Sequence, residues 1–202
     1  MLDLSDVSAD PARQENITKI LDAAERLFRH YGYAKTTVAD IARDLGMSTA
    51  NIYRFFASKT EIRQAVCGRM LEYSYQMALE IRRRPISASD RLHAYVYAQY
   101  KQTCENMLDE QKVHEMVVIA IEHDWHVIEK FIDRIHDLIA EIIAEGIAAG
   151  EFLEQDPYVA SKCFGAATTI LCHPQMVAQS LSKPNRAEPE DLIEFAIRAL
   201  KK

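Results

Sequence analysis

Apolar residues recur at three- and four-residue intervals along most of the chain, which is the spacing of one face of an α-helix. The first such run covers about residues 14–30 and ends at Gly32. Further helical runs cover about 88–108, 113–122, 126–149, 157–180 and 189–202. Pro174 lies within the 157–180 run and is expected to kink that helix. No segment shows the alternating pattern of a β-strand, so the sequence predicts an all-α protein.

Two short helices separated by a glycine follow the first helix. Thr37 can cap the first of them, with Asp40 three residues later completing a capping box. Gly46 stands where a left-handed residue ends a helix, and Ser48 can cap the next short helix. Ser58 then begins a fourth, longer helix. This order predicts a helix-turn-helix, whose second helix can enter the major groove of DNA.

The predicted helix-turn-helix carries hydroxyls, an amide and cations that suit DNA binding. Hydroxyl groups can donate to phosphate oxygens, whereas Asn51 and Arg54 can reach the edges of adenine and guanine. Tyr53 can direct its hydroxyl to phosphate, and Lys59 is a cation placed for the same backbone. The predicted DNA-binding residues are Thr36, Thr37, Ser48, Thr49, Ala50, Asn51, Tyr53, Arg54 and Lys59.

The net charge of −6 is unevenly distributed, and this supports the same interpretation. Residues 13–60 contain eight Lys or Arg against five Asp or Glu, a balance of +3. Residues 61–202 contain sixteen against twenty-two, a balance of −6, and the remaining −3 comes from aspartates in the first twelve residues. Only the segment with the helix-turn-helix is basic, as expected of a surface that binds DNA.

The segment LFRHYGYAKTTVADIARDLGMSTANIYRFFASKTEI, residues 27–62, resembles the N-terminal domain of TetR-type transcriptional repressors. The resemblance covers about residues 14–62, and it departs at Ala50, where many relatives carry glycine or proline. It implies a homodimer that binds a palindromic double-stranded DNA operator and a larger helical domain that binds a small effector. The expected organisation is a disordered leader (1–12), a three-helix DNA-binding domain (13–60) and an effector-binding and dimerisation domain (61–202).

The resemblance also implies that the last two helices form a four-helix bundle with those of a second copy. A small-residue segment, GAATT, would allow close helix approach in the first of these helices, and the last helix is rich in apolar residues. The alternative is that these residues fill the core of one protomer. The predicted dimer-interface residues are Gly165, Thr169, Ile193, Phe195, Ile197 and Leu200.

An effector site is implied between the DNA-binding domain and the dimer bundle. Aromatic, Met, Cys and hydroxyl side chains there collectively suit an apolar or aromatic effector, although most of them taken singly are better explained as ordinary core. The candidate residues are Tyr95, Tyr100, Cys104, Met107, Met116, Trp125, Phe131, Phe164 and Thr168. No cofactor is predicted.

A metal site is the weaker alternative for the second domain. His123 and His126 would share a helix face, and His114, Glu122, Cys172 and His173 could lie near them. No tight ligand motif accompanies them, so they are equally explained as polar residues at a helix corner, and no metal is predicted.

Other functional classes find little support. The sequence has no Gly-rich phosphate loop and no nucleophile elbow, and HEMVV lacks the second histidine of a zincin helix at Val118. A metal- or redox-responsive regulator of the same fold remains an alternative because four cysteines are present, and so does a helical adaptor that binds only protein. No run of about 18 apolar residues and no signal peptide is evident, so a cytoplasmic protein is expected.

Overall fold

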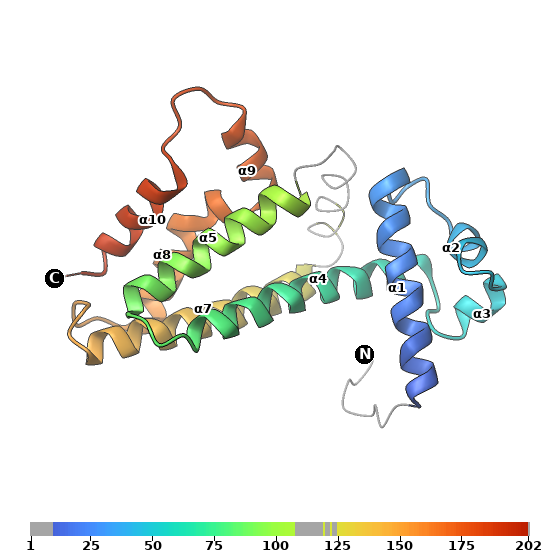
Figure 1. The fold of residues 1–202 in the computed structure, drawn as a ribbon, viewed down its shortest axis with the longest axis horizontal. Coiled ribbons are helices and arrows are strands. Elements are labelled where there is room, and N and C mark those ends of the chain that lie inside the picture. The colour runs from blue at the N-terminus through green and yellow to red at the C-terminus, as the bar shows by residue number, and fades with distance from the viewer. Residues whose placement is uncertain (1–9, 108–118, 120–121, 123–124, 202) are drawn as a thin grey trace. The chain divides into compact units, whose positions relative to one another are not determined.

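The computed structural model describes residues 10–107, 119, 122 and 125–201, and the chain divides into two compact units, residues 1–69 and 70–202 (Figure 1). The all-α prediction is confirmed: within the described residues there are helices and one isolated antiparallel bridge, between Phe152 and Lys201. The helices are α1 (Pro11–Tyr31), α2 (Val38–Asp44), α3 (Thr49–Tyr53), α4 (Lys59–Arg82), α5 (Ala88–Met107), α7 (Trp125–Ala148), α8 (Pro157–Cys172), α9 (Pro174–Leu181) and α10 (Pro189–Arg198).

Helix α1 begins three residues earlier than its apolar pattern suggests. The side chain of Asp10 accepts a hydrogen bond from the backbone N–H of Ala12, and Pro11 occupies the first helical turn. A proline needs no backbone N–H partner there, so the two residues together start the helix. Residues 11 and 12, assigned to the leader from the sequence, therefore belong to α1, and residues 1–9 lie outside the described chain.

The local signals around α2 and α3 are confirmed. The hydroxyl of Thr37 accepts from the N–H of Asp40, whose carboxylate accepts from the N–H of Thr37, so the capping box is complete. Gly46 has a φ of 64°, the left-handed conformation expected at the turn. The hydroxyl of Ser48 accepts from the N–H of Asn51 at 3.2 Å and begins α3. The backbone of the helix-turn-helix is thus fixed by contacts close in sequence.

Helix α4 begins with a variant of the predicted capping box. The hydroxyl of Ser58 accepts from the N–H of Glu61 at 3.1 Å, as predicted. The carboxylate of Glu61 accepts from Ala57, one residue before the cap, at 2.7 Å. The helix then contributes Ile62 and Val66 to the buried residues of the first unit.

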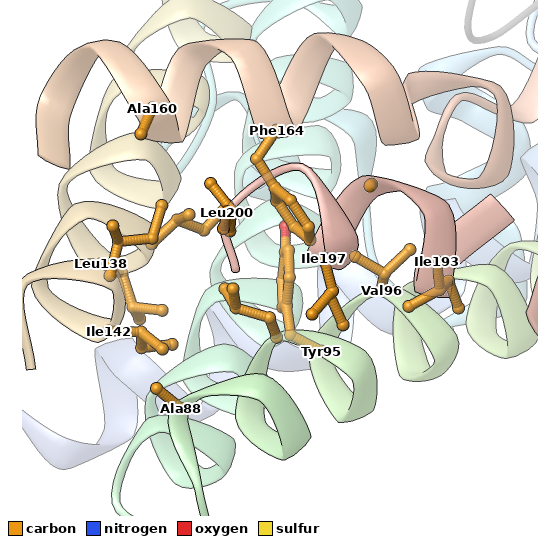
Figure 2. Close-up of a cluster of buried hydrophobic side chains, with 14 of the residues drawn as sticks. Ala88, Tyr95, Val96, Leu138, Ile142, Ala160, Phe164, Ile193, Ile197 and Leu200 are labelled. Atoms are coloured by element: carbon orange, nitrogen blue, oxygen red, sulfur yellow. The ribbon is translucent and has the colours of Figure 1, made fainter. Parts of the chain in front are cut away.

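The second unit has a continuous apolar core in which α5 contacts α7, α8 and α10 (Figure 2). Tyr95 and Val96 of α5 lie among Phe164 of α8 and Ile193 and Ile197 of α10 in this cluster. The N-terminus of α5 is capped from a distant segment, the turn after α7. There the carboxylate of Glu151 accepts from the backbone N–H groups of Ala88 and Ser89, both at 3.0 Å.

The segment expected to form one kinked helix from residue 157 to 180 is instead two helices. Helix α8 ends at Cys172, and His173 has an extended backbone, with φ −81° and ψ 122°. Pro174 lacks a backbone N–H and its ring disfavours helical geometry in the preceding residue, so the helix breaks where a kink was predicted. The helix expected over 113–122 lies outside the described residues, apart from two isolated positions.

Candidate nucleic-acid interface

An open hollow of about 430 Å³ lies on the first unit where α2, α3 and the start of α4 meet. Its lining combines hydroxyl, small apolar, phenol and ammonium groups. The lining residues are Ala34, Thr36, Thr37, Val38, Ala39, Thr49, Tyr53 and Lys59. Five of the nine predicted DNA-binding residues therefore share this hollow, which has the polarity needed to accept an anion.

Lys59 is held at the hollow by an aromatic ring. Its Nζ lies 4.0 Å from the ring centroid of Tyr33, and the guanidinium of Arg63 lies 5.3 Å from the same ring. Partial burial lowers the pKa of Lys59, and the nearby carboxylate of Asp40 opposes this effect in part. Contact with the ring fixes the direction of the ammonium group without neutralising its charge.

The cations of the first unit fall into two groups. In the described chain, Lys35, Arg54 and Lys59 have no carboxylate within ion-pair distance, although all three lie in or beside the helix-turn-helix. Cations elsewhere on the unit mostly have acidic partners: Lys19 with Glu15, Arg26 with Asp44, Arg29 with Glu25, Arg43 with Asp40, and Arg69 with Asp22 and Glu25. The helix-turn-helix segment thus carries three cations without an acidic partner in the described chain, and one of them, Lys59, lines the hollow.

Helix α3 presents its polar side to solvent. Ile52 is fully buried and anchors the helix, whereas Thr49, Ala50 and Arg54 are exposed. Tyr53 is 51% exposed and lines the hollow. Asn51 is half-buried. The side chains predicted to read bases and phosphates from this helix are therefore accessible to DNA, fully or in part.

The prediction is wrong for the hydroxyl of Thr36. This residue is 1% exposed, and its hydroxyl donates to the carbonyl of Gly32 at 2.8 Å, so it stabilises the turn after α1. Thr37 is exposed, but its hydroxyl also donates to the Asp40 carboxylate at 2.6 Å. Thr37 therefore acts first as a helix cap, and a phosphate would have to compete with Asp40 for it.

Sequence reasoning missed the small apolar residues of the hollow. Ala34, Val38 and Ala39 line it but carry no chemical group that would have marked them. Tyr33 was recognisable only as part of an aromatic-Gly-Tyr segment, and its role beneath Lys59 depends on the tertiary fold.

The candidate effector residues occupy different environments in the second unit. Tyr95, Phe164 and Thr168 are buried, with 5%, 3% and 3% of their surface exposed. Tyr100, Cys104 and Phe131 are half-buried. Met116 and the side chains of Met107 and Trp125 lie outside the described part of the chain.

Most of the predicted dimer-interface residues instead contact their own protomer. Ile193, Ile197 and Leu200 are at most 5% exposed and belong to the core of the second unit, because α10 packs on α5 and α8. Gly165 is also turned inward: a Cβ there would lie 2.9 Å from Nε2 of His136. The hydroxyl of Thr169 donates to the carbonyl of Gly165 at 2.7 Å.

Phe195 differs from these residues, since 71% of its surface is exposed. Val159 on α8 is 56% exposed, and Cys163 and Ala166 on the same helix are also exposed. An apolar surface does exist on these two helices, but it consists mainly of residues that the sequence did not single out.

The residues considered for a metal are not brought together in the described structure. His126 is exposed, and His123 and His114 lie outside the described residues. In the part of the chain that is described, no three His, Cys, Asp or Glu side chains are grouped closely enough to hold a metal ion. Nor is any helix there both long and apolar enough to cross a membrane.

The capped α2, the left-handed turn at Gly46 and the exposed polar face of α3 define a helix-turn-helix DNA-binding protein. Residues 20–66 match the family described as bacterial regulatory proteins, tetR family, and residues 88–193 match the tetracyclin repressor-like C-terminal domain. The chain belongs to the TetR family of DNA-binding transcriptional regulators.

Curated relatives agree with this assignment. The uncharacterised HTH-type transcriptional regulator YhgD of Bacillus subtilis (strain 168) is 25% identical over 146 residues, covering 68% of this chain and 72% of YhgD. The HTH-type transcriptional regulator TtgR of Pseudomonas putida is 45% identical over 53 residues, which are 26% of this chain and 25% of TtgR. The chain thus matches only about a quarter of the length of TtgR.

Solved structures share the fold. A TetR/AcrR-family regulator from Thermobifida fusca superimposes with a TM-score of 0.69 at 22% identity, covering 91% of this chain and 95% of that one. SmeT, the repressor of the Stenotrophomonas maltophilia multidrug efflux pump SmeDEF, gives a TM-score of 0.66 at 19% identity, covering 92% and 90%.

Proposed function

We propose that this regulator binds a palindromic operator as a homodimer, represses transcription there, and is released by a small effector. The observation that supports the DNA contacts most strongly is the distribution of ion pairs in the first unit. Lys59 and Arg54 have no carboxylate partner in the described chain, whereas Arg26 and Arg43 on the same unit do. Cations without acidic partners are free to displace counterions from phosphate.

We assign separate roles to Lys59 and Arg54. Lys59, which lines the hollow together with Tyr53, contacts a phosphate and fixes the position of the module on the duplex. Arg54 at the exposed end of α3 reaches a base edge, for which guanine offers two acceptors. Thr49 and Ser48 complete the phosphate contacts, and Thr36 has no part in them.

Operator titrations at several salt concentrations test these roles. With DNA from the region upstream of the gene, Arg54→Ala should weaken specific binding by about 1–3 kcal/mol and relax specificity at one position. Lys59→Ala should weaken binding to all sequences about equally and reduce the salt slope by about 1.

Arg26→Ala is the matched control, because it removes the same charge from the same unit at a position paired with Asp44. It should leave operator affinity and the salt slope nearly unchanged. If Arg26→Ala weakens binding as much as Lys59→Ala does, only net charge matters and the assigned interface is wrong.

The dimer surface that we propose is the exposed apolar face of α8 and α10. Val159, Cys163 and Ala166 lie at helical spacing on α8, and Phe195 on α10 is the most exposed of the large apolar residues in the described chain. A two-fold pairing of this surface would present two copies of α3 to half-sites about 34–36 Å apart.

Effector control is the third part of the proposal. RolR, solved in complex with resorcinol, has the same fold, with a TM-score of 0.61 at 14% identity over 94% of this chain and 89% of that one. A regulator of this fold can therefore hold a small aromatic molecule. We place the effector of this chain in the second unit, among Tyr95, Tyr100, Phe131 and Phe164. Its binding lowers operator affinity by favouring a conformation that DNA does not.

A further inference from the structure

Three polar residues form a buried stripe along α5. Tyr95, Gln99 and Thr103 are spaced four residues apart and are 5%, 9% and 6% exposed. The hydroxyl of Thr103 donates to the backbone carbonyl of Cys172 at the end of α8, at 3.2 Å. Figure 2 shows the ring of Tyr95 extending from α5 toward the side of α8 that carries Phe164. The stripe therefore lies inside the second unit, where apolar residues would pack more favourably.

Gln99 has much of its hydrogen-bonding capacity unused. Its Nε2 lies 3.5 Å from the hydroxyl of Tyr95, the limit of a hydrogen bond. An amide offers two donors and a carbonyl acceptor. Within the residues that the structure describes, the carbonyl oxygen and the second N–H of Gln99 have no partner. In the described chain, the fully buried side-chain atoms without a partner belong to arginines and histidines, so the Gln99 carbonyl oxygen keeps some accessible surface and can bind an additional hydrogen-bonding group.

Tyr95 adds a donor beside this amide. Burial raises the pKa of Tyr95, the neighbouring Cys172 thiol raises it further, and the bond from Gln99 lowers it slightly. The phenol therefore keeps its proton at physiological pH. In the described chain its O–H group has no acceptor, since its only hydrogen bond is the one it accepts from Gln99.

The same face of α5 also carries Arg91, four residues before Tyr95, whose side chain is 12% exposed and whose charge is paired with Glu145. The buried polar residues of the described second unit are Gln99, Thr103, Ser161 and Thr168, all of them neutral. The one buried charged residue of the described chain, Arg63, belongs to the first unit. An ionised ligand would therefore be left without a counter-charge, which interiors tolerate poorly.

We propose that Gln99 and Tyr95 form the specificity-determining centre of the effector site, and that it selects uncharged ligands carrying a hydrogen-bond donor and acceptor at one end of an apolar body. This inference rests on the proposed effector function and names the chemical class that the site accepts. Primary amides match the arrangement most fully, because the ligand carbonyl accepts from Tyr95 or Gln99 while its N–H donates to the Gln99 carbonyl.

Four probes of similar size separate this class from its alternatives: benzamide, benzoate, benzylammonium and toluene. Their affinities for the full-length protein are measured without DNA by ligand-observed NMR at neutral pH. Benzamide should bind about tenfold or more tightly than benzoate or benzylammonium, because both ions lose hydration without gaining a counter-charge. Equal or tighter binding of either ion, or no binding by any of the four, overturns the proposal.

Variants on α5 then assign the selectivity to residues. Gln99→Leu should reduce benzamide affinity about tenfold while toluene binding holds or improves, since a polar partner is replaced by an apolar one. Tyr95→Phe, which changes the side-chain volume very little, should also weaken benzamide binding. It replaces Gln99→Leu in this test if that variant does not fold. Gln102→Leu is the control: it is the same substitution on the same helix, at a glutamine whose amide donates to Ser74 at 3.1 Å. A change in probe ranking for Gln102→Leu as large as that for Gln99→Leu overturns the assignment.

Operator affinity, measured on the same variants, keeps the two proposals apart. Probe selectivity is recorded without DNA, so a failure of operator binding leaves that result intact. Conversely, suppose that Lys59→Ala weakens operator binding but the protein shows no preference among the four probes. The DNA-binding proposal is then retained and the amide-selective site is rejected.

Discussion

Gly46 and Gly68 differ in backbone conformation, although neither has a neighbour that an added side chain would meet within 4 Å. Gly46 has a φ of 64° at the turn between α2 and α3, where residues with a Cβ are strained. Gly68 lies inside α4 with no such φ, and a glycine there only adds freedom to the unfolded chain. The same substitution should therefore have opposite effects at the two sites.

Gly46→Ala should lower the free energy of unfolding by about 1–2 kcal/mol, because a left-handed backbone is costly for alanine. Gly68→Ala should raise it by about 0.5–1 kcal/mol, because alanine is the better helix former. Urea unfolding followed by circular dichroism measures both. Stabilisation by both substitutions would mean that the turn does not need a left-handed residue.

Residue roles were predictable from the sequence where they depend on near neighbours. Thr37 and Asp40 complete a capping box within four residues, and this was recognisable from their spacing. The adjacent Thr36 is buried, and its hydroxyl also lies 3.3 Å from the carbonyl of Leu27, nine residues earlier. No local pattern distinguishes a hydroxyl facing inward from one facing DNA, so Thr36 was misassigned.

At the scale of elements, α5 depends on a carboxylate from far along the chain. Glu151 accepts from both Ala88 and Ser89 at the start of the helix. Desolvation raises the pKa of Glu151, but hydrogen bonds from Ser89 and Ala88 lower it more, and the net shift is downward from 4.5. The carboxylate therefore stabilises the fold fully above about pH 4.5, and this contribution is lost as the pH falls through the lowered pKa.

Glu151→Gln should lower the free energy of unfolding by about 1 kcal/mol at pH 7, the typical size of a helix-cap contribution. The difference from the native protein should shrink as the pH falls well below 4.5, because the native carboxyl is then neutral as well. Urea unfolding at pH 7 and at about pH 3 measures it. Glu154→Gln, at an exposed position, is the control and should have little effect at either pH. A pH-independent difference would contradict the role of the charge.

Helix positions followed from apolar periodicity, whereas their interruptions and partners did not. The spacing that predicted one long helix over 157–180 continues through Pro174, but the backbone of His173 breaks it. The cap of α5 by Glu151 spans more than sixty residues, and a sequence read without tertiary contacts does not contain it.

At the scale of the whole molecule, the amphipathic pattern of α10 left its partner undetermined. Ile193, Ile197 and Leu200 fill the core of their own protomer, and Phe195 on the opposite side is exposed. Periodicity shows that a helix has an apolar face but not whether that face meets its own chain or a second copy. The dimer residues were therefore predicted on helices that do carry an exposed apolar surface, but most of them face the core.

Phe195→Asp should convert the proposed dimer to monomer. Each of the two copies would lose about 2 kcal/mol of apolar burial, which together raise the dissociation constant about a thousandfold. Sedimentation velocity over a range of protein concentrations measures this. Tyr73→Asp, at a 67% exposed aromatic residue on α4, is the matched control and should leave the dimer intact. A dimer that survives Phe195→Asp must use another surface.

The exposure of Cys163 gives the chain a built-in chemical reporter. Cys163 is exposed on α8 beside Val159 and Ala166, whereas Cys67, Cys104 and Cys172 are half-buried, and burial raises the thiol pKa of Cys172 to about 12. Maleimides react fastest with accessible thiols, so the exposed Cys163 should be labelled faster near neutral pH than the three half-buried cysteines. If two copies cover this face, the labelling rate should decrease as protein concentration rises, and assembly can be followed in the unmodified protein.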